Sequence, residues 1–460
     1  MKSEAPFKTQ LKMGKPEVPD INEIVNKRSF IHDALLLMGN RFFVMLITFG
    51  IGVVLARALG ADGRGVYTAV LVYPLMFLSL TEMGVRQSAI YYLGKQIFTS
   101  RQVVGAVSTL ILFSSLIGMV FCGIIMLTRG NITFSPTVII LAVSMIPFTL
   151  VTQYSAGIFL GKQLIQQFAF IQRMSKLLQL VLIVTIVWWL ATDVPGALLA
   201  LLLSSILAAG CAMWYVRKIS PLRPSFDWLV IQPLLTKGSA FAISTFIMIL
   251  NYRIDIILMQ RLSTASEIGI YTIAVGIAEL TWTLPQSVTT ALFSHSANAY
   301  DEQAFGYKVA RLFRVGVLVS LLVVICLAVA SPFLIPIIYG KEYIASVRVM
   351  QLLLPGVFFL LLLKLLSMDL AGRGRPLLTL WVKIPALVVN ILLNIYLLPR
   401  HGAQGAAISS SVSYFLTGFG FMLIYCWFTK LPIVELLHYQ RSDFNFIERL
   451  LPPFLKPKVR

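Results

Sequence analysis

The chain has 460 residues, of which 58% are hydrophobic and only 12% are charged, and its mean hydropathy is +0.85. Soluble domains carry about 25% charged residues, so this composition excludes a soluble globular fold and indicates that a lipid bilayer surrounds the chain. The formal charge of +19 is compatible with nucleic-acid binding, but the positions of the basic residues favour another explanation.

Apolar runs of about 20 residues, the length that crosses a bilayer, follow one another along the whole chain. They centre near Val44, Met76, Leu116, Pro147, Val181 and Leu203 in the first half, and near Ile249, Leu280, Leu322, Phe358, Leu387 and Leu416 in the second. The pattern predicts an all-α polytopic membrane protein with twelve transmembrane helices, six in each half.

The longest polar stretch between the halves predicts the domain boundaries. We expect an N-terminal tail (1–30), an N-lobe (31–217), an inter-lobe linker (218–237), a C-lobe (238–430) and a C-terminal tail (431–460). Between Pro432 and Phe454 apolar residues recur at helical spacing. This spacing favours an interfacial helix on the membrane surface, with a disordered tail as the alternative.

A short motif occurs twice, 204 residues apart. Arg57 stands eight residues before Gly65-Val66-Tyr67-Thr68, and Arg261 stands eight residues before Gly269-Ile270-Tyr271-Thr272. Each copy lies where one apolar run ends and the next begins. A repeat at half the chain length is typical of two-lobed transporters, whose binding site lies between the lobes near the bilayer midplane.

Lysine and arginine are distributed unevenly between the two sides of the predicted membrane. The tails and the even-numbered loops hold 26 of the 38 basic residues, and the odd-numbered loops hold 7. The positive-inside rule therefore predicts that both termini lie in the cytoplasm, on the inner (plasma) membrane. It also explains the net charge through topology and contact with anionic lipids, without nucleic acid.

Several residue types carry no predicted chemistry. Cys122, Cys211, Cys326 and Cys426 lie inside apolar runs without CxxC spacing, so we expect buried hydrophobic residues rather than disulfides. No histidine pair has metal-ligand spacing, and no cleaved signal peptide is expected. We predict no metal site, no cofactor and no catalytic residue.

Five segments resemble the polysaccharide transporter family of Wzx-type O-antigen flippases, within the multidrug/oligosaccharidyl-lipid/polysaccharide exporter superfamily. They are Leu55–Gly60 with Gly65-Val66-Tyr67, Asn251–Leu258, Ala278–Leu280 with Leu284–Ser287, Leu370–Pro376, and Asn390–Asn394 with Pro399, Gly402 and Gly405-Ala406-Ala407. The resemblance extends from about Ala34 to Phe428.

The resemblance implies a fold and a function. Family members have two six-helix lobes around a central V-shaped cavity and carry undecaprenyl-diphosphate-linked oligosaccharides from the inner to the outer leaflet. The implied partners are the lipid-linked glycan, anionic lipids, and the polysaccharide polymerase and ligase machinery. The rival within the superfamily is a cation-coupled exporter of drugs or metabolites. A membrane enzyme such as a polymerase is a third alternative, but no outer loop is long enough to hold its catalytic groups.

Charged residues within the predicted spans are the candidate site, because each costs roughly 2.5–3.5 kcal/mol at mid-bilayer without a partner or a wet cavity. Arg41 and Arg253 lie on repeat-equivalent helices and suit the oxygens of a pyrophosphate, with pairing to nearby acids as the alternative. Candidate substrate-binding residues are Arg41, Arg253, Arg86, Asn251 and Lys364. Candidate ion-coupling or charge-partner residues are Asp255, Glu279 and Glu82, for coupling to H+ or Na+.

The spacing of these residues separates some of the alternatives. Glu82 and Arg86 are four residues apart, which favours a structural ion pair. Asp255 lies about 200° around the helix from Arg253, so these two do not neutralise each other on a straight helix. Glu279 is either a coupling site or the partner of an arginine. Lys364 lies near a helix end, where its side chain could instead reach the interface.

Overall fold

The computed structural model describes residues 27–127, 134–281, 292, 296, 302–373, 375–440 and 443, and within these ranges it contains helices but no β-strands. The helices are α2 (Lys27–Thr81), α3 (Val85–Gly94), α4 (Ser100–Met126), α5 (Pro136–Gly161), α6 (Ile165–Ile183), α7 (Val194–Ile219), α8 (Trp228–Leu262), α9 (Ala265–Leu280), α11 (Glu302–Tyr339), α12 (Ala345–Gly372), α13 (Leu380–Thr429) and α14 (Ile433–Leu437). Short π and 3-10 turns follow α6, α11 and α12. Most of the predicted N-terminal tail lies outside the described residues.

Nine helical stretches in the described part of the chain are long and apolar enough to cross a membrane. Two of them, Leu36–Gly94 and Leu377–Thr429, each hold two spans. Gly60 in α2 and Gly402 in α13 have φ of 65° and 50°, values that glycine adopts readily and that reverse the chain there. Because two of the nine stretches hold two spans each, the described residues contain eleven spans, and α9 is the start of a twelfth. The predicted twelve-helix, all-α membrane fold is confirmed.

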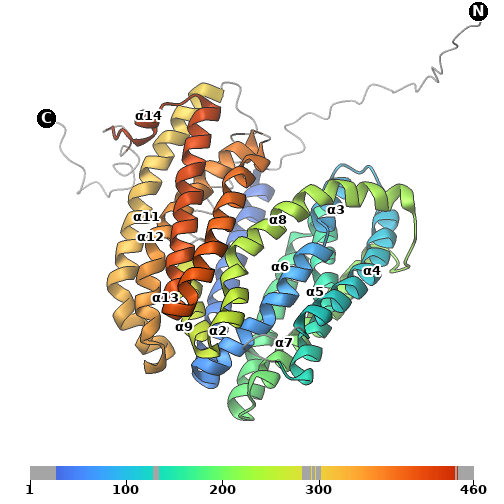
Figure 1. The fold of residues 1–460 in the computed structure, drawn as a ribbon. Helices are drawn as coiled ribbons and strands as arrows, with labels where there is room; N and C mark the ends of the chain where they lie inside the picture. Colours follow the sequence, from blue (N-terminus) through green and yellow to red (C-terminus); the bar gives the residue numbers. More distant parts are fainter. Residues whose placement is uncertain are drawn as a thin grey trace, which may run out of the picture.

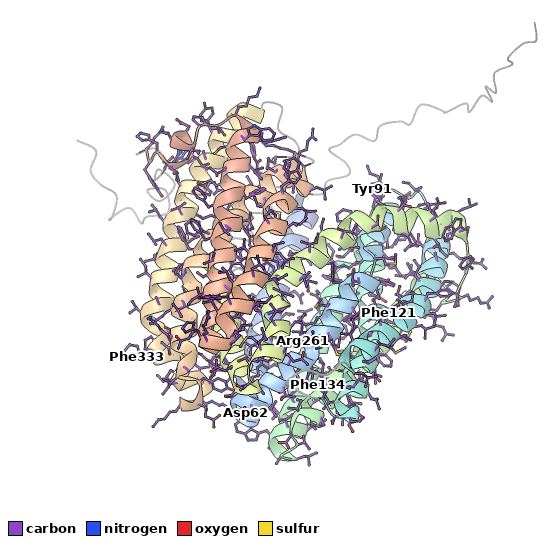
Figure 2. The ribbon with its side chains drawn as sticks, viewed as in Figure 1. Asp62, Tyr91, Phe121, Phe134, Arg261 and Phe333 are labelled. Atoms are coloured by element: carbon purple, nitrogen blue, oxygen red, sulfur yellow. The ribbon has the colours of Figure 1, made fainter. Side chains whose placement is uncertain are left out.

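The spans form two bundles, with α4–α7 in one and α11–α13 in the other, while α2 and α8 lie between them (Figure 1). Each bundle has its own apolar core. One core is built from α2–α7 and the start of α8, and the other from the rest of α8, α9 and α11–α14 with Ala56, Ala69 and Val72 of α2. The outward faces are apolar as well: Phe121 on α4 and Phe333 on α11 are 54% and 69% exposed (Figure 2). Such faces are stable only against lipid, so this is a multi-pass membrane protein.

The segment between the lobes differs from the predicted linker of residues 218–237. α7 continues to Ile219 and α8 begins at Trp228, so only residues 220–227 connect the helices. Asp227 caps α8 by accepting a hydrogen bond from the amide of Leu229 at 3.1 Å. The first turns of α8 then pack on the N-lobe, where the Ser88 hydroxyl donates to the Leu234 carbonyl at 2.7 Å. The Asp227 cap and the packing of α8 on the N-lobe keep the start of α8 helical although its sequence is polar.

We call the end of the bundle that carries α14 and the start of α8 the terminal side, and the end with the Gly60 and Gly402 breaks the far side. On the far side the lobes contact each other through the repeated motif. A β-carbon on Gly65 would collide with the Ala265 carbonyl, and one on Gly269 would collide with the Ala61 carbonyl. Only glycine permits such close backbone approach, so the two copies of the motif form one contact, which we call the far-side seal.

Polar side chains reinforce the far-side seal. The Arg57 guanidinium donates to the carbonyls of Ile337 and Ile338 at 2.5 and 2.8 Å, near the end of α11. A cation is favourable at this position because the last carbonyls of a helix lack partners and carry partial negative charge. The Tyr343 hydroxyl donates to the Ala56 carbonyl at 3.1 Å. In Figure 2, Arg261 and Phe134 lie where the two bundles meet.

The start of the C-terminal tail is anchored to α11. Asp443 accepts two hydrogen bonds from the Arg314 guanidinium, at 2.6 and 2.8 Å, and Arg314 also donates to the Glu435 carbonyl at 2.6 Å. Of the predicted interfacial helix between Pro432 and Phe454, only the five residues of α14 are helical, and residues 438–440 after them are not. The part of that prediction from Phe444 to Phe454 lies outside the described residues.

Candidate substrate-binding site

Arg253 of α8 and Glu279 of α9 form a two-pronged ion pair. The two guanidinium nitrogens each lie 3.2 Å from one carboxylate oxygen. The side chains are 29% and 25% exposed, so the pair is reachable and is not sealed in the core. Pairing with an arginine is the alternative that the sequence left open for Glu279, and Arg253 is that partner.

Three further basic side chains lie within electrostatic range of this pair or of one another. Lys364 of α12 interacts electrostatically with Glu279, with Lys383 of α13 and with Arg41 of α2. Helices from both lobes therefore bring together four cations and one acid. We call these five residues the cationic cluster: Arg41, Arg253, Glu279, Lys364 and Lys383.

Arg41 is the exposed member of the cationic cluster and comes from the N-lobe. In the part of the chain that the structure describes, no acid forms an ion pair with it. An arginine in a membrane helix is costly unless water or a ligand surrounds it. The excess positive charge between the lobes therefore suits an anionic ligand.

Asp255 lies two residues after Arg253 on α8, on the opposite face of the helix, and is buried inside the C-lobe with no exposed surface. One carboxylate oxygen accepts from the Asn394 amide at 2.7 Å, and the other accepts from the hydroxyls of Tyr271 and Ser410 at 2.7 and 2.5 Å. These donors are neutral, and no ion pair to Asp255 occurs among the described residues. Such a carboxylate is stable when protonated or when a small cation binds to it.

The surroundings of Asp255 hold unused hydrogen-bonding groups. Asn251, one turn earlier on α8, is 3% exposed, and its side-chain amide nitrogen has no partner. The Asn390 amide nitrogen and the Asn394 carbonyl oxygen also lack partners. Asn251 and Asp255 share a helix face, as their spacing predicts. The structure places this face in the C-lobe interior, so Asn251 is not in the cationic cluster.

Glu82 and Arg86 form the ion pair that their spacing predicts, at 3.3 Å. The helix between them is not continuous, because α2 ends at Thr81 and α3 begins at Val85. The Tyr154 hydroxyl donates to the carbonyls of Thr81 and Glu82, each at 3.1 Å, and so holds this break against α5. The structure gives the pair a place in the N-lobe packing, and neither residue is in the cationic cluster.

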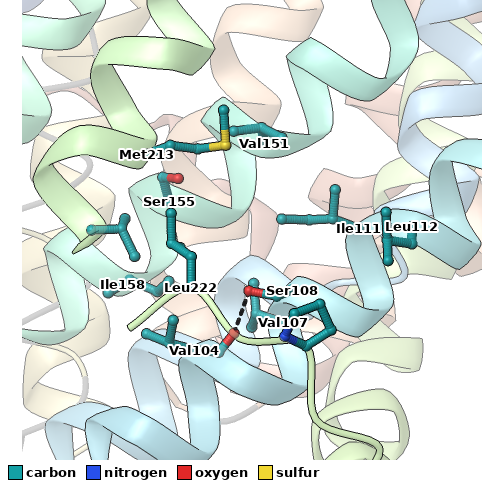
Figure 3. A pocket seen from close by; sticks show the side chains of 12 residues that line it. Val104, Val107, Ser108, Ile111, Leu112, Val151, Ser155, Ile158, Met213 and Leu222 are labelled. Carbon is teal, nitrogen blue, oxygen red and sulfur yellow. Dashed lines mark hydrogen bonds between the residues drawn. The ribbon is translucent and has the colours of Figure 1, made fainter. Parts of the chain in front are cut away.

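The N-lobe also contains an apolar cavity of about 200 Å3 between α4, α5 and α7 (Figure 3). Its polar side chains are Ser108 and Ser155, and the Ser108 hydroxyl is satisfied by the Val104 carbonyl at 2.8 Å. The cavity holds no charged group. It therefore lacks the chemistry that an anionic substrate requires.

Sequence reasoning gave Lys383 and Lys176 no role in the site. Lys176 is one of the 26 basic residues that hydropathy assigns to the tails and even-numbered loops, but it lies in the twelfth position of α6. The sequence contains the signal, since Gln172, Lys176 and Gln179 recur at helical spacing in this segment. For Lys383, the signal in the sequence is a lysine inside an apolar run, two residues before Pro385.

Comparisons with known proteins agree with this geometry. A family model described as "Polysaccharide biosynthesis protein" matches residues 54–348. The chain is 24% identical over 227 residues to the "Putative O-antigen transporter" of Shigella flexneri, covering 48% of this chain and 53% of that protein. The chain spans about half or less of the length of the curated relatives that it matches.

Solved structures share the fold. Lipid II flippase MurJ in an inward closed conformation has a TM-score of 0.67 and 16% identity, covering 90% of this chain and 92% of its own. An inward-facing multidrug resistance transporter of the MATE family, in the MOP superfamily, has a TM-score of 0.66 and 14% identity, covering 84% and 94%. The chain therefore shares the fold of these two structures over most of its length.

Proposed function

The chain belongs to the polysaccharide biosynthesis protein family, and from this premise we propose that it is a flippase for polyprenyl-diphosphate-linked oligosaccharides. The substrate would be an O-antigen, capsule or exopolysaccharide unit that passes from the inner to the outer leaflet by alternating access. The observation that carries this proposal is the cationic cluster between the lobes.

The cationic cluster matches the chemistry of a diphosphate. Four cations surround one acid, so an excess of positive charge remains after Arg253 pairs with Glu279. A diphosphate offers several anionic oxygens, and arginine binds two of them at once through its planar fork. Its charge would compensate the cost of holding Arg41, Lys364 and Lys383 within the membrane.

Orientation follows from the distribution of basic residues. We propose that the terminal side is cytoplasmic, because 25 of the 38 lysine and arginine residues belong to the tails and to the loops assigned to that side once Lys176 is placed in α6. The far-side seal then closes the site toward the outer surface. This state would accept substrate from the inner leaflet of the cell inner membrane.

Asp255 is the candidate for coupling transport to an ion gradient. It is fully buried, it has neutral hydrogen-bond donors, and it lies two residues from Arg253 on α8. Binding of H+ or Na+ would neutralise it, and release would leave an uncompensated charge that favours another packing of α8, α9 and α13. The polymerase and ligase machinery that would use the product remains part of the proposal.

The rival function is a cation-coupled exporter of drugs or metabolites with the same fold. The typical substrates of such exporters are cations, which an acidic site would bind. Among the described residues of the cationic cluster the ratio of four cations to one acid opposes that chemistry. The charge of the site therefore favours the flippase.

The test is transport in proteoliposomes. Purified protein is reconstituted with polyprenyl-diphosphate-linked oligosaccharide, and the fraction that reaches the opposite leaflet is measured with a membrane-impermeant sugar-oxidising reagent. We expect wild type and Arg217→Ala, an exposed arginine at the end of α7, to transport alike. Arg41→Ala should lose at least tenfold, since a charge-assisted hydrogen bond contributes about 1.5–3 kcal/mol. Efflux of an organic cation without movement of the lipid would instead establish the rival function.

A further inference from the structure

A row of polar side chains runs along one face of α6 in the N-lobe. Gln172, Lys176 and Gln179 are spaced i, i+4 and i+7, which places them on one side of the helix. The Asn40 amide of α2 donates to the Gln172 carbonyl oxygen at 2.8 Å, and the Lys176 ammonium donates to the Gln179 carbonyl oxygen at 2.9 Å. Tyr67 of α2 lies close enough to Gln179 to interact with it electrostatically. We call these residues the N-lobe row: Asn40, Tyr67, Gln172, Lys176 and Gln179.

Lys176 has no structural need that explains it. It stands eleven residues after the start of α6, roughly 16 Å into the helix at 1.5 Å per residue. Its described partner is the neutral Gln179, and no ion pair to Lys176 occurs among the residues that the structure describes. A lysine at such depth costs several kcal/mol and usually belongs to a functional site.

Both ends of the N-lobe row lie beside an arginine of α2 that interacts with the C-lobe. At one end, Asn40 precedes Arg41, which interacts electrostatically with Lys364 of α12. At the other end, the Arg64 guanidinium lies 5.7 Å from the centre of the Tyr67 ring and interacts with Tyr339 and Tyr343 of the C-lobe. The row therefore lies between α2 and α6, next to Arg41 of the cationic cluster at one end and next to Arg64 at the other.

The N-lobe row has unused capacity for hydrogen bonds. The side-chain oxygen Oδ1 of Asn40 and the Nε of the neighbouring Arg64 have no hydrogen-bond partner, and the Gln172 side chain is exposed. Carboxamides donate and accept at once, as a sugar ring with several hydroxyls requires. A lysine without an acid adds a fixed positive charge, which an anionic group on the ligand would compensate.

We propose that the N-lobe row is the subsite for the oligosaccharide part of the substrate, and that Lys176 selects glycans that carry a sugar carboxylate. This inference rests on the proposed function, in which the cationic cluster holds the diphosphate. The exposed Gln172 carboxamide binds sugar hydroxyls, the buried members of the row hold Gln172 and Lys176 in place, and the Lys176 ammonium pairs with the carboxylate of an acidic sugar.

The test is binding of three lipids to the purified full-length protein. The lipids are polyprenyl diphosphate alone, the same lipid with a neutral trisaccharide, and the same lipid with a trisaccharide in which one hexose is replaced by the corresponding hexuronic acid. We expect affinity to rise in that order for wild type. Lys176→Gln should bind the acidic glycan about tenfold more weakly, to the level of the neutral one, while Lys176→Arg keeps most of the preference.

The other variants separate this subsite from the proposed function. Gln172→Leu should weaken both glycans toward the level of the bare lipid, and Arg41→Ala should weaken all three lipids alike. Lys218→Gln, at an exposed lysine near the end of α7, is the matched control and should change nothing. Equal affinity of wild type for neutral and acidic glycans, or an unchanged preference in Lys176→Gln, overturns the subsite. Failure of wild type to bind even polyprenyl diphosphate overturns the proposed function itself.

Discussion

Gly65 and Gly269 occupy the same position in the two copies of the repeated motif, and each packs against the backbone of the helix that carries the other. A β-carbon on Gly65 would lie 3.0 Å from the amide nitrogen of Gly269 and would collide with the Ala265 carbonyl. The reciprocal contact of Gly269 with Ala61 gives the far-side seal an approximate two-fold symmetry. The two copies of the repeated motif therefore provide the two surfaces of one contact, the far-side seal.

Alanine at either glycine should prevent the far-side seal from closing. Since alanine favours the helix over glycine by about 1 kcal/mol, lower activity cannot come from weaker helix propensity. We expect Gly65→Ala and Gly269→Ala to reduce lipid transport at least tenfold in proteoliposomes. Gly276→Ala on the same helix as Gly269 meets no atom within 4 Å and should transport as wild type does. Full activity of both seal variants would contradict a gating role.

The repeat shows how much the sequence could predict. The number and order of spans follow from hydropathy alone, because lipid forces every long apolar run to be helical. Pairing of Arg253 with Glu279 could not be assigned, since no sequence spacing brings α8 and α9 side chains together across 26 residues. Lys176 was misplaced because charged residues near a span end resemble a loop. The start of α8 was missed because prolines and charges obscure a helix that is stabilised by docking.

Asp443 should hold the C-terminal tail on α11 in a pH-dependent way. The hydrogen bonds from Arg314 lower the pKa of this carboxyl below its ordinary value of 3.8. A group with a depressed folded-state pKa stabilises the fold above its unfolded pKa and loses that contribution as pH falls through the folded pKa. Docking of the tail should thus be unchanged from pH 8 to about pH 5 and weaken progressively below about pH 4.

The Asp443→Asn variant should reproduce the low-pH state at pH 7. Arg314 and Asp443 side chains are 5% and 1% exposed, so the variant leaves a buried guanidinium unpaired at a cost of about 3 kcal/mol. Hydrogen exchange of residues 433–440 should then rise roughly a hundredfold. Equal exchange in wild type and variant would show that the apolar contacts of α14 alone hold the tail.

Asp255→Asn should uncouple transport from the ion gradient without unfolding the C-lobe. Asparagine has the same shape and still accepts from Tyr271 and Ser410, but it binds neither H+ nor Na+ in exchange. We expect wild-type transport to accelerate several-fold under an imposed pH or Na+ gradient and the variant to be insensitive to both. A gradient response retained in Asp255→Asn would exclude this residue as the coupling site.

Reporter fusions test the orientation of the whole bundle. Fusions after Lys162 and Arg223, which lie on the terminal side, should read cytoplasmic, and a fusion after Lys341, on the far side, should read external. The cytoplasmic and external fusions should give very different reporter signals, because loops rich in lysine and arginine resist translocation across the membrane. An inverted pattern at two of these positions would place the far-side seal at the cytoplasm and reverse the proposed direction of transport.

The Arg253–Glu279 pair distinguishes a substrate site from a structural ion pair. If Arg253 binds diphosphate, Arg253→Ala should lower transport at least tenfold, and Arg253→Lys should keep part of it because lysine retains the charge but not the fork. If the arginine serves only to neutralise Glu279, the single variant is harmed by the unpaired carboxylate, and Arg253→Ala/Glu279→Gln should recover. We expect no recovery in the double variant, because it still lacks the Arg253 guanidinium that would bind the diphosphate.

Expression and melting temperature are matched across these variants so that transport is compared at equal amounts of folded protein. Glu279→Gln alone should keep the affinity for polyprenyl diphosphate or raise it, since it removes the single acid of the cationic cluster and frees Arg253 for the ligand. A tenfold loss of affinity in Glu279→Gln would mean that the carboxylate must first orient the guanidinium. Recovery of transport in the double variant to near the wild-type rate would make the pair structural and leave Arg41, Lys364 and Lys383 to bind the diphosphate.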